Sequence, residues 1–164
     1  MSLIENKERI FSQVAQAMET ANRTDQVNVI AVTKYVGIDQ AKALVDTGVR
    51  HIGENRVDKF LEKYQALKDE GLTWHLIGSL QRRKVKEVIN FVDYFHALDS
   101  MKLAQEIQKR ASHPIKCFIQ VNISGEESKH GFAPEELDAL LPEIEALDNL
   151  QIVGLMTMEI GRAS

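Results

Sequence analysis

Val27-Asn28-Val29-Ile30-Ala31-Val32-Thr33-Lys34 is the stretch that decides the fold, and the chain then turns through Tyr35-Val36-Gly37. An apolar, β-branched run of this length, bounded by a glycine, is typical of a buried strand. An amine at the mouth of such a strand loses hydration, which lowers its pKa, so Lys34 could be a neutral nucleophile that condenses with an aldehyde. Judged by its position alone, Lys34 is better explained as an ordinary lysine at a strand end whose ammonium group reaches water. The interpretation of Lys34 as a nucleophile is favoured only by the rest of the sequence.

The composition is that of an ordinary globular protein with a single domain, residues 1–164. The chain has 164 residues, 44% of them hydrophobic, and a formal net charge of -4, which allows a real core and argues against a generally basic nucleic-acid-binding surface. Cys117 is the only cysteine, which excludes an intrachain disulfide and fits a reducing compartment. No secretory signal or membrane-length apolar run is present. We therefore expect a cytoplasmic protein without nucleic-acid or membrane partners.

Strand-like and helix-like segments alternate along the chain. After a helix at about residues 2–21, strands are expected at 27–34, 49–53, 73–77, 91–96, 115–123 and 150–155, separated by amphipathic helices. This alternation predicts βαβ units, right-handed crossovers and a parallel sheet. Both an open doubly wound sheet and a (β/α)8 barrel fit it. Gly37 stands alone after the first strand, so the glycine-rich fingerprint of a dinucleotide-binding sheet is missing.

Polar side chains gather where the predicted strands end, which is the edge at which parallel α/β folds carry their chemistry. They include Lys34, Glu54, Asn55, His75, Ser79, Gln81, His96, Asp99, Asn122, Ser124, Lys129, His130 and Thr157. No pair of histidines has the spacing of a zinc-binding helix, and Ser124 and Ser128 show no pattern of a hydrolase triad. The gathering therefore predicts a binding site next to Lys34.

Several of these residues also have a structural explanation, and the residues alone leave both open. His75 lies in an apolar strand, where a hydrogen-bonded core histidine is as plausible as a cofactor contact. Glu54 and Asn55 could cap the next helix or contact a ligand. A basic cluster in the fourth helical segment is explained most simply as a solvated face, with binding of an anion or a phosphorylated partner as the alternative. The cluster consists of Arg82, Arg83, Lys84 and Lys86.

Five further blocks accompany the Lys34 segment in a fixed order. They are His51-Ile52-Gly53-Glu54-Asn55, Trp74-His75-Leu76-Ile77-Gly78-Ser79-Leu80-Gln81, His96-Ala97-Leu98-Asp99-Ser100, Gln120-Val121-Asn122-Ile123-Ser124-Gly125-Glu126-Glu127-Ser128-Lys129-His130-Gly131-Phe132 and Val153-Gly154-Leu155-Met156-Thr157-Met158. With Ala31-Val32-Thr33-Lys34, they resemble the pyridoxal phosphate homeostasis proteins, the YggS-like family, which is similar to the barrel domain of alanine racemase. The blocks span nearly the whole chain.

The resemblance implies a (β/α)8 barrel and pyridoxal 5′-phosphate held as an internal aldimine (a Schiff base) on Lys34. Asn55, His75 and Met156 occupy positions that resemble the wall of the cofactor pocket. The implied function is that of a carrier or regulator in vitamin B6 and amino-acid homeostasis, without established turnover. The implied partners are the cofactor and the apoenzymes that depend on it.

The sequence departs from the family pattern after Met158, where it reads Glu159-Ile160-Gly161-Arg162-Ala163-Ser164. Only about six βα units are predicted, whereas a barrel of this class has eight and typically about 250 residues. The phosphate site of such barrels usually follows strands seven and eight, so we expect the clamp on the cofactor phosphate to be missing. We also expect exposed edges at the first and sixth strands, and self-association that covers them.

Three functions remain open at this stage. The first is a non-catalytic protein that buffers or delivers pyridoxal 5′-phosphate. The second is an amino-acid racemase or decarboxylase that uses the same linkage, although no tyrosine is convincing as its acid or base. The third is a fragment with weakened or no cofactor binding.

Overall fold

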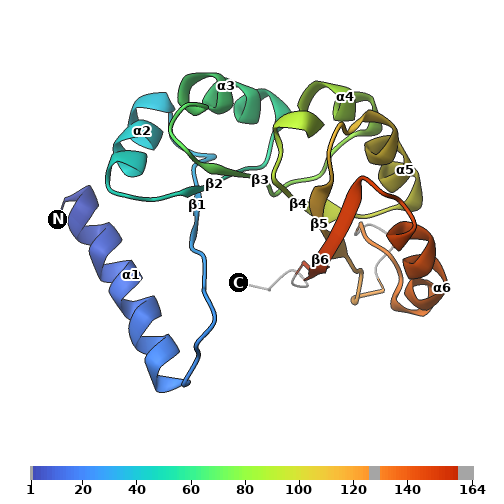
Figure 1. The fold of residues 1–164 in the computed structure, drawn as a ribbon, viewed down its shortest axis with the longest axis horizontal. Helices are drawn as coiled ribbons and strands as arrows, with labels where there is room; N and C mark the ends of the chain where they lie inside the picture. Colours follow the sequence, from blue (N-terminus) through green and yellow to red (C-terminus); the bar gives the residue numbers. More distant parts are fainter. Residues whose placement is uncertain (1, 126–129, 159–164) are drawn as a thin grey trace.

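The computed structural model describes residues 2–125 and 130–158, which form a six-stranded parallel sheet in the order β1-β2-β3-β4-β5-β6 (Figure 1). The strands are β1 (Ile30–Val32), β2 (His51–Glu54), β3 (Thr73–Leu76), β4 (Tyr94–Leu98), β5 (Ile115–Gln120) and β6 (Leu150–Met156). A doubly wound sheet reverses its strand order at a switch point, and this order never reverses. The sheet is part of the wall of a (β/α) barrel, as predicted. The described residues form five βα units and a sixth strand, and β1 and β6 are the two edges of the sheet.

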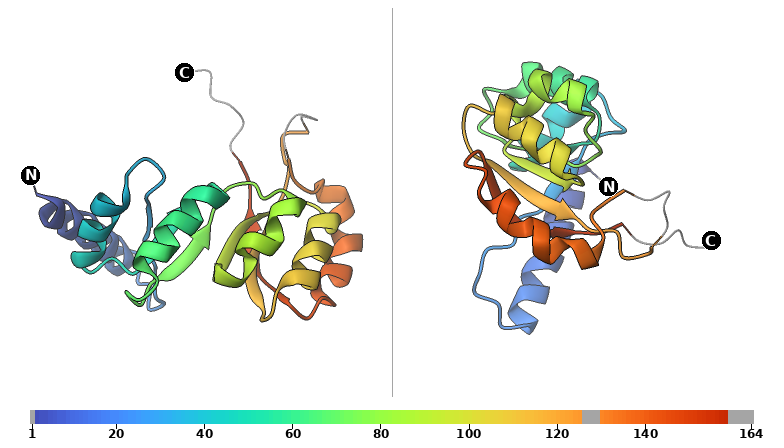
Figure 2. Two further views of the ribbon diagram at one scale, coloured as in Figure 1. Left: turned by 90° about the horizontal axis from the view of Figure 1, so that it is seen from above. Right: turned by 90° about the vertical axis from the view of Figure 1, so that its right-hand side faces the viewer.

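Helices cover the convex face of this wall, and α1 lies beside the β1 edge (Figures 1 and 2). The helical elements are α1 (Leu3–Thr20), α2 (Ile38–Asp46), α3 (Val57–Leu67), η1 (Arg82–Lys84), α4 (Val85–Val88), η2 (Ile89–Phe91), α5 (Met101–Arg110) and α6 (Pro134–Glu145), where η marks a 3-10 turn. Side-chain hydrogen bonds cap the starts of α5 and α6. Ser100 Oγ accepts a hydrogen bond from Leu103 N, and Glu136 Oε1 accepts one from Ala133 N. No helix among the described residues has the length and hydropathy that a membrane crossing requires.

The hydrophobic core lies between the helices and the sheet. Ile52, Leu76, Phe95 and Cys117 are fully buried there, because alternate residues of a strand point to the same face. The intervening positions point to the concave face, where β2, β3 and β4 carry histidines in place of aliphatic residues. The chain therefore separates an apolar layer under the helices from a polar layer inside the wall.

Two predictions about strands and helices were wrong in detail. The first strand contains only Ile30–Val32, so Thr33 and Lys34 lie beyond its end, and Val32 is 51% exposed because no described segment covers the concave face at the β1 edge. The amphipathic segment after β3 is not one continuous helix. It is divided into η1, α4 and η2, and η1 begins after Gln81 without a side-chain cap.

Some predicted features lie outside the described residues. They are the loop residues Ser128 and Lys129 and the departure from the family pattern at 159–164.

Candidate functional site

Lys34 lies in the turn that follows β1. Val36 N donates a hydrogen bond to Thr33 O at 3.2 Å, which closes this turn. The Lys34 side chain is half-buried, and its Nζ lies 5.1 Å from the ring centre of Tyr35, which is 89% exposed. Within residues 2–125 and 130–158, no carboxylate forms an ion pair with Lys34. The amine is therefore accessible, and no described acidic group holds it.

A buried ion pair supports this turn from the helix side. Lys63 Nζ on α3 lies 2.8 Å from Glu54 Oε2 at the end of β2, and the two side chains are 3% and 0% exposed. Lys63 Nζ also donates to Thr33 O at 3.0 Å, and the Thr33 hydroxyl donates to Glu54 Oε2. Glu54 Oε1 has no hydrogen-bond partner among the described residues. The residue next to Lys34 is thus fixed both to β2 and to α3.

A hollow of about 240 Å³ adjoins the Lys34 turn. Its lining comprises Lys34, Tyr35, Val36, Gly37, Lys59, Glu62 and Lys63. Lys59 forms a weak exposed pair with Glu62 at 3.6 Å. Lys34 and Lys59 together make one side of this hollow suitable for a ligand that carries both an electrophilic carbon and an anionic group.

Three histidines form a hydrogen-bonded chain across the concave face. His51 Nδ1 lies 3.0 Å from His75 Nε2, and His75 Nδ1 lies 2.9 Å from His96 Nε2. Tyr94 stacks on the His75 ring with centroids 4.7 Å apart. Both nitrogens of His75 are therefore occupied, which makes it a hydrogen-bonded core histidine in this structure. It can wall a pocket but offers no free nitrogen to a ligand.

The surroundings of His51, His75 and His96 favour the neutral form of each ring. Burial, with the neighbouring His96 and His51, lowers the pKa of His75 to about 3. Burial also lowers the pKa of His51, against an opposing effect of Asp93, and lowers the pKa of His96. In a chain of neutral imidazoles each contact has one donor and one acceptor, so a single direction of donation runs through all three rings. No group of three or more His, Cys, Asp or Glu residues in the described part of the chain could hold a metal ion.

Asn55 follows β2 directly, next to the residue that ends the buried pair. It is half-buried, and the loop after β3 approaches it closely at Gly78. A Cβ on Gly78 would lie 2.3 Å from Asn55 O and 2.9 Å from Asn55 Cβ. Only glycine lets the two loops meet at this distance. Asn55 caps no helix through its side chain, because α3 begins after Arg56.

Met156 lies elsewhere. It is the last residue of β6, and its carbonyl accepts a hydrogen bond from Val121 N at 2.8 Å. It lines a separate hollow of about 330 Å³ between β6 and α6, which Lys34 does not line. The structure places Lys34 and Asn55 after the neighbouring strands β1 and β2, and Met156 on β6 at the opposite edge of the sheet. Asn55, His75 and Met156 are not among the described residues that line the Lys34 hollow.

Two elements of the site were not predicted from the sequence. Lys63 falls on the apolar stripe of α3, three residues after Phe60 and four before Leu67, and a lysine in that position is a signal for a buried partner. The partners of His75 were missed because contact between side chains of different strands depends on register. His75 pairs with Gly53 on β2 and with Tyr94 on β4. His51 lies two residues before Gly53 and His96 two residues after Tyr94, so the three rings follow one another across the sheet.

Comparison with known proteins agrees with this architecture. The family model for the alanine racemase N-terminal domain matches residues 6–160. A pyridoxal phosphate homeostasis protein of Aquifex aeolicus is 39% identical over 162 residues, which are 96% of this chain and 71% of the relative. A second such protein, from Pseudomonas aeruginosa, is 32% identical over 96% of this chain and 70% of the relative.

Solved structures show the same fold. The structure of PipY from Synechococcus elongatus with PLP bound superposes with a TM-score of 0.81 at 28% identity, covering 99% of this chain and 73% of PipY. An alanine racemase of Clostridium difficile gives a TM-score of 0.66 at 19% identity over 81% of this chain, which indicates a shared fold only.

Proposed function

Since the chain belongs to the alanine racemase N-terminal domain family and, within it, to the pyridoxal phosphate homeostasis proteins, we propose that it binds pyridoxal 5′-phosphate through Lys34 and takes part in vitamin B6 and amino-acid homeostasis. The relatives' names and the PLP bound to PipY support the cofactor. The observation in this chain that carries the proposal is an accessible lysine, unpaired with any described carboxylate, held at the end of β1.

The residues around Lys34 fit this cofactor. Pyridoxal 5′-phosphate supplies an aldehyde that acts as an electrophile and a phosphate that carries negative charge. The Lys34 amine, when neutral, forms a bond to the aldehyde carbon and one water is released. Lys59 in the same hollow is an exposed cation that can attract the anionic group. The buried Glu54–Lys63 pair fixes Thr33, so the backbone that carries Lys34 is positioned before any ligand arrives.

The remaining predicted pocket residues have different roles in this proposal. Asn55, beside Glu54, is placed to donate or accept a hydrogen bond at the rim. His75 acts through the histidine chain as part of the pocket floor, with its nitrogens already engaged. Met156 would contribute an apolar wall from the far strand.

We further propose that the protein holds and releases the cofactor without turnover. The relatives are named as homeostasis proteins and not as enzymes, which supports this proposal. Racemisation also needs an acid and a base on the two faces of the substrate. Tyr35 is nearly fully exposed, and Tyr94 stacks on His75, so neither supplies an obvious second group. Racemase or decarboxylase activity is the alternative, and steady racemisation of amino acids by the reconstituted protein would establish it.

Delivery, compartment and assembly extend the proposal. We propose that apoenzymes requiring pyridoxal 5′-phosphate receive it from this protein in the cytoplasm, and the buried free thiol of Cys117 fits a reducing compartment. We also propose that copies self-associate at the β6 edge. Exposed apolar side chains collect there, with Ile123 62%, Leu155 65% and Met158 61% exposed. Size-exclusion chromatography with light scattering that shows a monomer at high concentration would exclude self-association.

The central experiment is reduction of the cofactor adduct. Protein is incubated with pyridoxal 5′-phosphate and treated with borohydride, and the intact mass and peptide map locate the adduct. We expect one equivalent on Lys34, with an absorbance band at about 420 nm before reduction. Lys34→Ala removes the adduct, whereas Lys68→Ala, which changes an exposed lysine outside the hollow, keeps it. An adduct that persists in Lys34→Ala would show that the lysine is wrongly assigned.

A further inference from the structure

A cationic hollow lies on the convex face between the η1–α4 segment and α5, away from the residues of the Lys34 hollow. Its volume is about 330 Å³. Its lining comprises Arg82, Arg83, Lys86, Lys102, Gln105, Glu106, Lys109 and Arg110. Six of these eight side chains are cationic and one is a carboxylate, although the chain as a whole carries a formal net charge of -4. The hollow is therefore a local cluster of positive charge in a chain that is acidic overall.

Most of this charge is not neutralised. Glu106 pairs with Arg110 at 3.3 Å across one turn of α5. Across the described ranges, 2–125 and 130–158, no carboxylate forms an ion pair with any of the other cations of the hollow. These are Arg82, Arg83, Lys86, Lys102 and Lys109. The hollow therefore holds an excess of positive charge, and a bound anion would reduce the repulsion between these cations.

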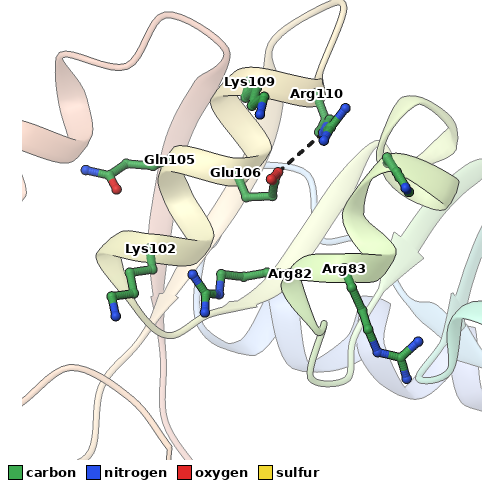
Figure 3. Close-up of a pocket in the computed structure, with 8 residues that line it drawn as sticks. Arg82, Arg83, Lys102, Gln105, Glu106, Lys109 and Arg110 are labelled. Atoms are coloured by element: carbon green, nitrogen blue, oxygen red, sulfur yellow. Dashed lines mark hydrogen bonds and ion pairs between the residues drawn. The ribbon is translucent and has the colours of Figure 1, made fainter.

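The cations come from two elements that face each other. Figure 3 shows Arg82 reaching from η1 toward Lys102 of α5, with Glu106 and Arg110 joined higher on the same helix. Lys102 lies in the first turn of α5, where a cation opposes the helix dipole. Like charges that line one small hollow repel one another. An arrangement that is unfavourable when empty becomes favourable when a multiply charged anion bridges the two elements.

The lining also narrows the class of anion. None of the eight described residues that line the hollow is aromatic, so they offer no ring on which a base of single-stranded nucleic acid could stack. Arginine guanidinium groups bind phosphate oxygens in pairs, and lysines add point charges. A flat basic face would suit a long polyanion, whereas cations on two walls of a small hollow suit a short one.

We propose that this hollow binds a short chain of phosphate groups, either inorganic polyphosphate or the phosphate chain of a nucleotide, with Arg82 and Lys102 as its opposed ligands. The alternative, also open from the sequence, is that these cations form a solvated basic face that binds no specific ligand. The proposed site shares no residue with the hollow at Lys34, so it is independent of the cofactor assignment.

Isothermal titration with sodium tripolyphosphate, ATP and AMP tests this proposal on the full chain at low and moderate salt. We expect tripolyphosphate and ATP to bind with similar affinity, AMP to bind at least about tenfold more weakly, and affinity to fall with salt. ATP binding without tripolyphosphate binding would show that a base is recognised and would overturn the proposal. Binding of a single-stranded RNA or an acidic peptide without tripolyphosphate binding would overturn it as well.

A pair of matched variants separates a built site from overall charge. Arg82→Gln with Lys102→Gln should weaken tripolyphosphate binding by about tenfold or more. Arg9→Gln with Lys68→Gln removes one arginine and one lysine at exposed positions outside the hollow, and should bind like the unchanged chain. Circular dichroism confirms that both variants are folded. Equal losses in the two variants would show that only net charge matters and would refute the site.

Discussion

Lys63 Nζ lies 2.8 Å from Glu54 Oε2, and both side chains are almost completely removed from solvent. A buried pair of this kind is costly to desolvate, so it is weak proof of stability by itself. Its position is more informative. The same ammonium group binds Thr33 O at 3.0 Å, directly before Lys34. The pair therefore connects the end of β2, the helix α3 and the turn that presents the proposed cofactor lysine.

Removal of Lys63 should destabilise the protein strongly. Lys63→Met leaves the Glu54 carboxylate buried without its cation, and breaking such a pair typically costs about 3–5 kcal/mol. Urea unfolding, followed by circular dichroism, measures the change in the free energy of unfolding. In the folded fraction the Lys34 turn also loses its support, so the borohydride-trapped adduct should form more slowly.

Lys59→Met supplies the control, because Lys59 is on the same helix but exposed and only weakly paired. Its free energy of unfolding should change by less than about 0.5 kcal/mol. Equal effects of the two substitutions would mean that the buried pair has no special role.

The histidine chain predicts a loss of stability in mild acid. The folded-state pKa of His75 is lowered to about 3 from an ordinary value of 6.5. Below pH 6.5 the unfolded protein therefore binds a proton at His75, whereas His75 in the folded protein stays neutral. The stabilising difference is complete above pH 6.5 and is lost as the pH falls toward 3, at up to about 1.4 kcal/mol per pH unit. His51 and His96, whose pKa values are also lowered, act in the same direction.

Urea unfolding between pH 6.5 and 5, above the range in which most carboxylates titrate, isolates this effect. His75→Gln should reduce the slope of unfolding free energy against pH. His113→Gln, which changes an exposed histidine, should leave the slope as it is. If the slope of His75→Gln matched that of the unchanged chain, the neutral histidine chain would not be the cause.

Much of the fold follows from local sequence pattern. Apolar strands that alternate with amphipathic segments predicted the parallel sheet and the approximate place of each element. The pattern alone could not decide between a doubly wound sheet and a barrel, since both use the same βαβ unit. The barrel was predicted from the resemblance to the pyridoxal phosphate homeostasis proteins. The length of β1 was overestimated because apolar residues beyond the strand, such as Val27, also satisfy the pattern.

The site was predictable only where a single residue carries the signal. Lys34 stands out because a cation follows an apolar segment, although β1 itself ends at Val32 and Lys34 lies in the turn after it. The support beneath it depends on a contact between β2 and α3 that no local pattern specifies. The histidine chain depends on the register of three strands, so the prediction for His75 could not choose between a core residue and a cofactor contact.

Gly78 should tolerate no side chain. In Gly78→Ala the new Cβ would meet Asn55 O at 2.3 Å, and backbone atoms must move to accommodate it. We expect a loss of about 1–3 kcal/mol in the free energy of unfolding, as for other overpacked sites. Gly37→Ala is the matched control, because no atom lies within 4 Å of its added Cβ, and it should cost less than about 1 kcal/mol. A Gly78→Ala protein as stable as that control would contradict the close approach.

Cys117 should react only when the protein unfolds. Its side chain is 0% exposed, and burial raises the pKa of the thiol to about 12. At pH 8 almost no thiolate is present, and the thiolate is the species that attacks a disulfide reagent. We expect Ellman's reagent to label native protein at a rate set by opening of the fold, and denatured protein at once. A Gln65→Cys, Cys117→Ser variant moves the thiol to an exposed position on α3 and should be labelled rapidly in the native state. Rapid labelling of native Cys117 would show that solvent reaches the layer between β5 and the helices, and that this part of the core opens far more readily than its burial implies.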